Sequence, residues 1–168
     1  MEVEKQEGPR CTAYSTANLI QYLYRQKYGI SIKLDPMEFY ERTKFSDKSP
    51  RLDRVCAELE KKGIKTLDGK YIKIKSFIHV LRGNIWQTVK SGGPMLIVID
   101  TEKGEPIHKR LNKDLILRAR TKGSHAIVAI EVDGAYMCIA DSNKTTPDFW
   151  FLPMTMQKII TDAYYITL

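Results

Sequence analysis

Cys11, His125 and Asp141 supply the three side-chain types that cysteine-based nucleophilic catalysis needs. A thiolate attacks a carbonyl carbon, an imidazole takes and returns the proton, and a carboxylate holds the imidazole ring in the useful tautomer. His125 follows a Gly-Ser break and begins the apolar run 126–130, which is typical of a side chain presented at a strand end. The residue types and their order therefore predict a thiol nucleophile, a general acid/base and an orienting group.

The segment after Cys11 has the periodicity of a helix that packs on one face. Its apolar residues recur at helical spacing, namely Ala13, Ala17, Ile20, Leu23 and Tyr24. We expect this helix to begin at or beside Cys11 and to stop before Gly29. Amide groups and the macrodipole at a helix N-terminus favour an anion, so the position of Cys11 favours a thiolate.

The rest of the chain predicts an α+β protein in which helices precede strands. Helices are expected from Pro36, from Ser49-Pro50 to Gly63, and from Ser76 to Val89, with a strand at 70–75. Strands are expected at 94–100, 124–132, 135–140, 148–152 and 162–167, with Asp133-Gly134 as a two-residue hairpin turn. We expect a single domain over 1–168 with a helical lobe at about 1–91 and an antiparallel β lobe at about 92–168, and the site between them.

The other cysteines and histidines have structural interpretations. Cys56 and Cys138 lie among apolar residues and are expected to be small core side chains. His79 is expected to be a partly buried structural residue on a helix, and His108 a solvated residue in a charged loop. Three cysteines without metal-ligand spacing favour free thiols in a reducing compartment. No metal or cofactor is implied.

Charge and hydropathy limit the classes of partner. No apolar run approaches the roughly 20 residues that span a bilayer, and the N-terminus lacks a signal-peptide pattern, so we expect a cytoplasmic protein with no membrane partner. The net charge is +7, and basic residues gather before His125, namely Lys103, Lys109, Arg110, Lys113, Arg118, Arg120 and Lys122. This segment, 103–122, could bind nucleic acid, but no interleaved aromatic residues or known nucleic-acid motif accompany it. We interpret it as a solvated surface that, if it contacts substrate, selects acidic side chains.

Several short motifs resemble papain-like cysteine peptidases. Cys11-Thr12-Ala13-Tyr14-Ser15 is similar to the Cys-Trp-Ala-Phe-Ser run of that family, and Gln6 with Gly8 resembles its upstream glutamine element. The strand that begins at Gly93-Pro94 and the run His125-Ala126-Ile127-Val128 are similar to family strands, and Asp141-Ser142-Asn143 corresponds to its Asn-Ser-Trp triplet. Few residues precede Gln6, so the resemblance implies a compact form without the family's prosegment.

The resemblance implies a papain-like two-lobed fold and hydrolysis of peptide or isopeptide bonds in a protein or peptide substrate. Cys11 would be the nucleophile, His125 the acid/base and Asp141 the orienting residue, while Gln6 and the Cys11 backbone N–H would form the oxyanion hole. Asp141 replaces the family's Asn, and Asn143 is the alternative orienting residue.

Two other functions stay open. Acyl transfer of the transglutaminase type, or deamidation, also uses a Cys-His-Asp set, and Asp141 suits it. A binding protein or effector that has lost turnover on this fold is the second alternative, because Thr12 replaces the family's Trp.

Overall fold

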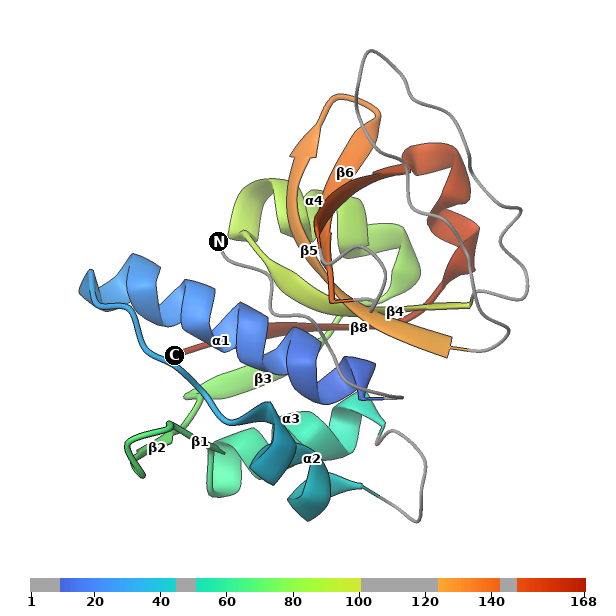
Figure 1. Cartoon of the computed structure of the whole chain (residues 1–168). Coiled ribbons are helices and arrows are strands. Elements are labelled where there is room, and N and C mark those ends of the chain that lie inside the picture. Colours follow the sequence, from blue (N-terminus) through green and yellow to red (C-terminus); the bar gives the residue numbers. More distant parts are fainter. Residues whose placement is uncertain (1–9, 45–50, 101–123, 143–147) are drawn as a thin grey trace.

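The computed structural model describes residues 10–44, 51–100, 124–142 and 148–168. Helices come first along the chain and an antiparallel sheet follows, so the arrangement is α+β (Figure 1). The helix α1 (Cys11–Tyr28) packs against the sheet, and the shorter helix α2 (Pro36–Thr43) packs on α1. The helix α3 (Leu52–Lys61) contacts the sheet directly. Gln6, the basic segment 103–122 and Asn143 lie outside the described residues.

The ends of the first two helices follow from their sequences. Gly29 ends α1 in a left-handed conformation with φ of 69°, and its N–H donates to the carbonyl of Arg25 at 2.9 Å. Asp35 caps α2 by accepting from the N–H groups of Met37 and Glu38 at 3.1 and 3.0 Å, and Pro36 occupies the first turn. The predicted helix after Cys11 and its stop at Gly29 are confirmed.

Arg42 ties α2 to α3. Its guanidinium pairs with Glu38 at 3.1 Å and with Glu58, and it donates to the carbonyl oxygen of Gly63 at 2.6 Å. A short hairpin of β1 (Ile64–Lys65) and β2 (Tyr71–Ile72) follows. Arg42 therefore joins α2, which packs on α1, to α3, which packs on the sheet (Figure 1).

The sheet has six strands in the order β3-β8-β4-β5-β6-β7, and each neighbouring pair is antiparallel. The strands are β3 (Ser76–His79), β4 (Met95–Asp100), β5 (Ser124–Asp133), β6 (Tyr136–Asp141), β7 (Asp148–Pro153) and β8 (Ile160–Thr167). The short helices η1 (Arg82–Asn84) and α4 (Ile85–Gly92) connect β3 to β4, and η2 (Met154–Ile159) connects β7 to β8. The strands expected after residue 93 are confirmed.

Three details of the sequence prediction are wrong. The strand expected at 70–75 covers only Tyr71–Ile72. Residues 76–79 form a strand paired with β8, and the helix begins only at Ile85. The hairpin turn consists of Gly134 and Ala135, because Asp133 already pairs with Tyr136. Gly134 has φ of 58°, which a glycine adopts without steric cost.

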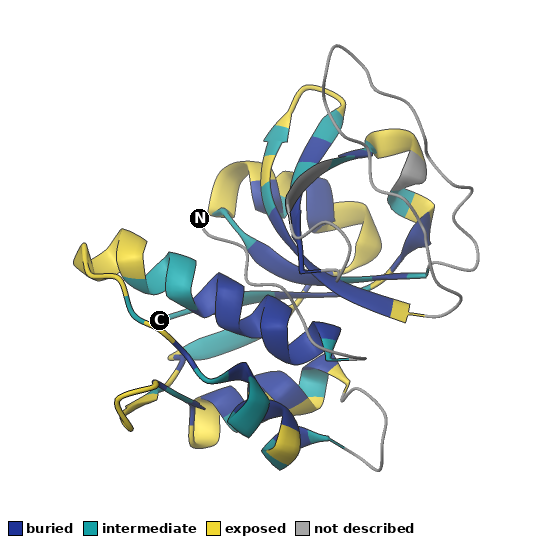
Figure 2. Ribbon diagram, in the orientation of Figure 1, coloured by how far each residue is buried: buried dark blue, intermediate teal, exposed yellow. Residues whose placement is uncertain are grey.

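Alternating side chains of the sheet build two cores. On β4, Met95, Ile97 and Ile99 pack with α4, whereas Leu96 packs with α1, α2 and α3. The half of α1 next to Cys11 is buried between these layers, and its far end is exposed (Figure 2). The fold therefore holds the N-terminus of α1 firmly against the sheet.

None of the helices in the described part of the chain has the length and apolar character that a membrane crossing requires.

Candidate active site

Cys11 is the first residue of α1 and lies against the sheet. Arg10 precedes it at the N-cap position and makes no side-chain cap hydrogen bond. Cys11 is only 8% exposed, so protein atoms and not solvent surround most of its side chain. At this position the helix macrodipole and the first-turn N–H groups favour a negative charge on sulfur.

His125 and Asp141 are brought together by the β5–β6 hairpin. Nε2 of His125 lies 2.6 Å from Oδ1 of Asp141, and the two side chains are 10% and 5% exposed. Because a carboxylate accepts and does not donate, Nε2 carries the proton in this bond. Nδ1 is then the ring nitrogen left for the thiol of Cys11, with which the imidazole also hydrogen bonds.

A β-bulge in β5 places the side chains of His125 and Asp141 on the same face of the sheet. The pairs are Asp133–Tyr136 and Val132–Met137 near the turn, and Ala129–Ile139 and Val128–Ala140 beyond the bulge. A shift of one residue moves a side chain to the other face of a sheet. Without the bulge, Asp141 would lie opposite Val128 and point away from His125. With it, Asp141 lies on the face of His125.

The pKa of His125 reflects opposing effects. Burial lowers the pKa of the imidazole, but the hydrogen bond to Asp141, then the bond to Cys11 and the charges of both groups, raise it to about 10. The ring is therefore protonated at neutral pH when the thiol carries a negative charge. This arrangement can form a thiolate–imidazolium pair.

Ser15 joins the two halves of the site. Its Oγ donates to the carbonyl oxygen of Ala126 at 2.7 Å in a buried hydrogen bond. Ser15 lies one turn after Cys11, and Ala126 follows His125. The sequence motif contained Ser15, but its spacing gave no indication of this contact, since the partner lies far along the chain.

The structure brings together three of the four residues that the sequence selected. His125 contacts both Cys11 and Asp141, and Asp141 is the carboxylate beside the imidazole. Gln6 and the alternative orienting residue Asn143 lie outside the described residues, so their roles stay predictions.

The other two cysteines differ from Cys11. Cys56 is fully buried, and burial, followed by the charges of Asp162 and Asp53, raises the pKa of its thiol to about 12. Cys138 is only partly buried, contrary to the expected core position, and burial followed by Glu131 raises the pKa of its thiol to about 11. All three cysteines are free, as expected.

The described residues include no cluster of three or more His, Cys, Asp or Glu side chains that could hold a metal ion.

A pocket of about 290 Å³ opens beside Cys11. Its lining residues come from both layers, namely Cys11, Thr12, Arg51, Leu52, Val98, Ser124, Ala126, Thr161 and Asp162. Leu52, Val98 and Ala126 are apolar, whereas Arg51 and Asp162 carry charge. Thr12, Ser124 and Thr161 add hydroxyl groups. A group bound here would lie next to the proposed nucleophile.

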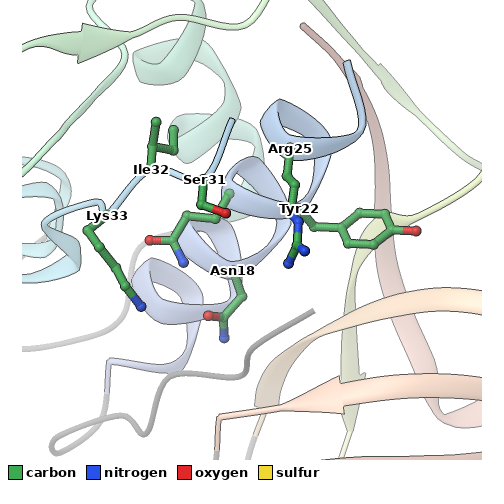
Figure 3. Close-up of a pocket in the computed structure, with 7 residues that line it drawn as sticks. Asn18, Tyr22, Arg25, Ser31, Ile32 and Lys33 are labelled. Atoms are coloured by element: carbon green, nitrogen blue, oxygen red, sulfur yellow. The ribbon is translucent and has the colours of Figure 1, made fainter. Parts of the chain in front are cut away.

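A second pocket of about 170 Å³ lies further along α1 (Figure 3). Asn18, Tyr22, Arg25, Ser31 and Lys33 are among the residues that line it, and the ring of Tyr22 extends away from the other side chains (Figure 3). The residues that line it do not include Cys11, His125 or Asp141. It is therefore separate from the site at the start of α1.

The fold is papain-like. The structure of the Carica candamarcensis cysteine protease CMS1MS2 in complex with E-64 matches with a TM-score of 0.75 and 16% identity over 99% of this chain and 92% of that chain. A structure from the study of the mite allergens Blo t 1 and Der p 1 matches with a TM-score of 0.72 and 14% identity over 100% of this chain and 67% of that chain. Digestive procathepsin L 3 of Tenebrio molitor larval midgut matches with a TM-score of 0.69 and 13% identity over 100% of this chain.

The chain spans 66% of the length of that procathepsin. No protein-family model matches the sequence, and neither does any curated protein. At these identities the likeness establishes the fold, and the expected papain-like architecture is confirmed.

Proposed function

We propose that this protein is a cysteine peptidase that hydrolyses peptide or isopeptide bonds. The observation that carries the proposal is the contact of one imidazole with a thiol at a helix N-terminus and with a buried carboxylate, 2.6 Å away. The sequence analysis predicted cysteine-based nucleophilic catalysis by these same residues, Cys11, His125 and Asp141. A papain-like fold, shared with cysteine proteases, supports a protein or peptide substrate.

In the first half of the reaction, the Cys11 thiolate attacks the carbonyl carbon of the scissile bond. The carbonyl electron pair moves to oxygen and gives a tetrahedral oxyanion. When the oxyanion collapses, the C–N bond breaks and the His125 imidazolium gives its Nδ1 proton to the leaving amine. The product is a thioester on Cys11 and a neutral imidazole.

In the second half, the neutral His125 removes a proton from water, and the resulting hydroxide attacks the thioester. Collapse of the second tetrahedral oxyanion releases the carboxylic acid, which loses its proton, and restores the thiolate and imidazolium. Asp141 keeps Nε2 protonated and the ring turned toward the thiol throughout.

Stabilisation of the oxyanion is assigned to the backbone N–H of Cys11 and the side-chain amide of Gln6. The first N–H groups of a helix have no acceptor within the helix and point out of its end, so the Cys11 N–H is directed toward an attacked carbonyl. Replacing Gln6 with Ala should lower kcat by about 10²- to 10³-fold, the usual cost of one lost oxyanion donor.

Labelling with E-64, which is bound in the Carica candamarcensis structure, tests the nucleophile. We expect one adduct on Cys11 by peptide mapping, and none in Cys11→Ala. Cys138→Ala, which removes a partly exposed thiol away from the site, is the matched control and should label like the wild type. Labelling of Cys56 or Cys138 in place of Cys11 would contradict the assignment.

Turnover separates hydrolysis from its alternatives. The wild type is incubated with a fluorogenic peptide library and an isopeptide-linked substrate, with and without a primary amine. Hydrolysis gives free acid in both conditions, whereas acyl transfer gives an amide that forms only with the amine. A protein that labels on Cys11 but turns over no substrate in either condition would fit a binding function.

A further inference from the structure

Among the described residues that line the pocket beside Cys11, Asp162 alone carries a carboxylate, and the sheet register explains why it lies there. Val98 on β4 pairs with Ala126 on one side and with Asp162 on the other. Directly opposite residues point to the same face of a sheet, so all three side chains face the pocket. Two strand spacings separate Ala126 from Asp162, which is roughly 10 Å, and Ala126 is the residue after His125.

A β-bulge presents Asp162 to this pocket. Val98 pairs with Asp162 and Ile99 pairs with Ile160, so Thr161 is the extra residue on β8. Bulges of this kind redirect side chains and occur next to functional sites. Thr161 and Asp162 both line the pocket as a result.

The contacts of Asp162 leave one carboxylate oxygen available. Oδ1 accepts from the N–H of Ala163 at 3.1 Å and lies 3.1 Å from Nε2 of His79. Within the described part of the chain, no donor contacts Oδ2. His79 is not the partly buried helix residue that the sequence suggested, since it lies on β3 and its side chain is 50% exposed.

Arg51, the cationic residue among the described residues that line the pocket, does not compensate this carboxylate. Nη2 of Arg51 is paired with Oδ2 of Asp53 at 2.9 Å, and the Arg51 side chain is 85% exposed. The pocket therefore keeps a negative group at one end, and Leu52, Val98 and Ala126 provide apolar walls next to it. A volume of about 290 Å³ is at the lower end of the range for ligand pockets, so it suits a single long side chain.

We propose that Asp162 makes this protein selective for a substrate with a basic side chain, Lys or Arg, next to the scissile bond. The aliphatic stem of such a side chain packs against the apolar walls, and its cationic head pairs with Oδ2 of Asp162. This inference rests on the proposed peptidase function. It differs from the acidic preference expected from the basic segment 103–122, because it follows from residues that line the pocket itself.

Peptides bound to the Cys11→Ala variant test the selectivity without turnover. A set of fluorescent peptides carries Arg, norleucine or Glu at each position beside the scissile bond, and Kd is measured by anisotropy. We expect the best Arg peptide to bind roughly three- to tenfold more tightly than its norleucine counterpart, since Asp162 is partly exposed.

Further substitutions assign the preference to Asp162. Adding Asp162→Asn should remove the Arg advantage, and Asp162→Lys should favour the Glu peptide. Asp133→Asn removes the same charge at the hairpin turn, away from the pocket, and should keep the advantage. The proposal would be overturned if the Cys11→Ala variant with Asp162 intact bound Arg peptides no more tightly than norleucine peptides. It would also be overturned if the tighter binding of Arg peptides persisted after Asp162→Asn was added.

The same peptides are then offered to the chain with Cys11 intact. An Arg preference in Kd without cleavage of any peptide would refute the peptidase function and leave the pocket assignment supported. Cleavage of all peptides with equal kcat/KM and equal Kd would refute the role of Asp162 and leave the peptidase function supported.

Discussion

Ser15 on α1 donates its hydroxyl to the carbonyl oxygen of Ala126 on β5, at 2.7 Å and between residues 111 apart in the sequence. One turn before Ser15 lies Cys11, and one residue before Ala126 lies His125. The bond therefore fixes the helix that carries the proposed nucleophile against the strand that carries the proposed base. A displacement of about 1 Å between such groups can cost about 10²-fold in rate.

Ser15→Ala should lower kcat by roughly tenfold with little change in KM, because the thiol and imidazole lose their fixed spacing while the substrate pocket is kept. The loss of a buried hydrogen bond should also lower the free energy of unfolding by about 1–3 kcal/mol. Ser91→Ala is the matched control, because Ser91 donates to the carbonyl of Gln87 at 2.8 Å in an exposed position on α4. Steady-state kinetics and urea unfolding measure both effects, and equal kcat in both variants would contradict a positioning role for Ser15.

Cys11 and Cys56 should respond in opposite ways to substitution by Ser. Cys11→Ser should abolish turnover and leave the thermal midpoint nearly unchanged, because the thiol serves chemistry more than packing. Cys56 is 0% exposed in the core between α1, α3 and the sheet, so Cys56→Ser buries a hydroxyl and should cost about 1–3 kcal/mol of stability. Activity assays and thermal unfolding of both variants check this. Full activity in Cys11→Ser would refute the nucleophile assignment.

The sequence predicted His125 and the two residues that contact it better than it predicted the geometry that joins them. Residue types and order selected Cys11, His125 and Asp141, and the hairpin between His125 and Asp141 was expected to bring its ends together. The bulge that places Asp141 on the face of His125 was not predicted, since a single extra residue in an apolar strand leaves no pattern. Asp162 was missed for the same reason, because its bulge and its pocket arise from strands distant in the sequence.

The strand β3 shows how tertiary pairing overrides a local pattern. Residues from Phe77 to Val89 carry apolar side chains at helical spacing, and a helix was expected there. Instead, Ser76–His79 pairs with β8, and Leu81, which the helix would have buried, is 66% exposed. The available edge of β8 stabilises an extended backbone, and this gain exceeds a weak intrinsic helix preference.

Activity should depend on reductant although stability should not. All three cysteines are free, so dithiothreitol has no disulfide to remove, and the thermal midpoint should stay constant. Mild peroxide should inactivate the protein by oxidising Cys11, and dithiothreitol should restore activity from the sulfenic acid or a mixed disulfide. Thermal scans and activity recovery measure the two effects. A midpoint that drops by several degrees in dithiothreitol would contradict the prediction.

Asp141 should control the pH range of activity through His125. Burial lowers the pKa of the imidazole, but Asp141 and Cys11 outweigh it and raise the pKa to about 10. Since activity requires the imidazolium, the alkaline limb of kcat/KM should lie well above the usual range of an imidazole. The ordinary value is near 6.5, so the stabilisation that the charged ring contributes to folding is fully present below about pH 6.5 and is lost as pH rises toward 10.

Asp141→Asn keeps an oxygen that can accept from Nε2 but removes the negative charge. Much of the activity should remain, the alkaline limb should move to lower pH, and stability should decrease mainly below the folded-state pKa of His125, where the ring is charged. Asp141→Ala should leave the ring unoriented and lower kcat/KM by roughly 10- to 1000-fold. The pH–rate profiles of the three proteins, together with unfolding at pH 6 and pH 10, measure these effects. Should Asp141→Ala match the wild type in rate while Asn143→Ala is inactive, Asn143 is the orienting residue and the contact at 2.6 Å is not used in catalysis.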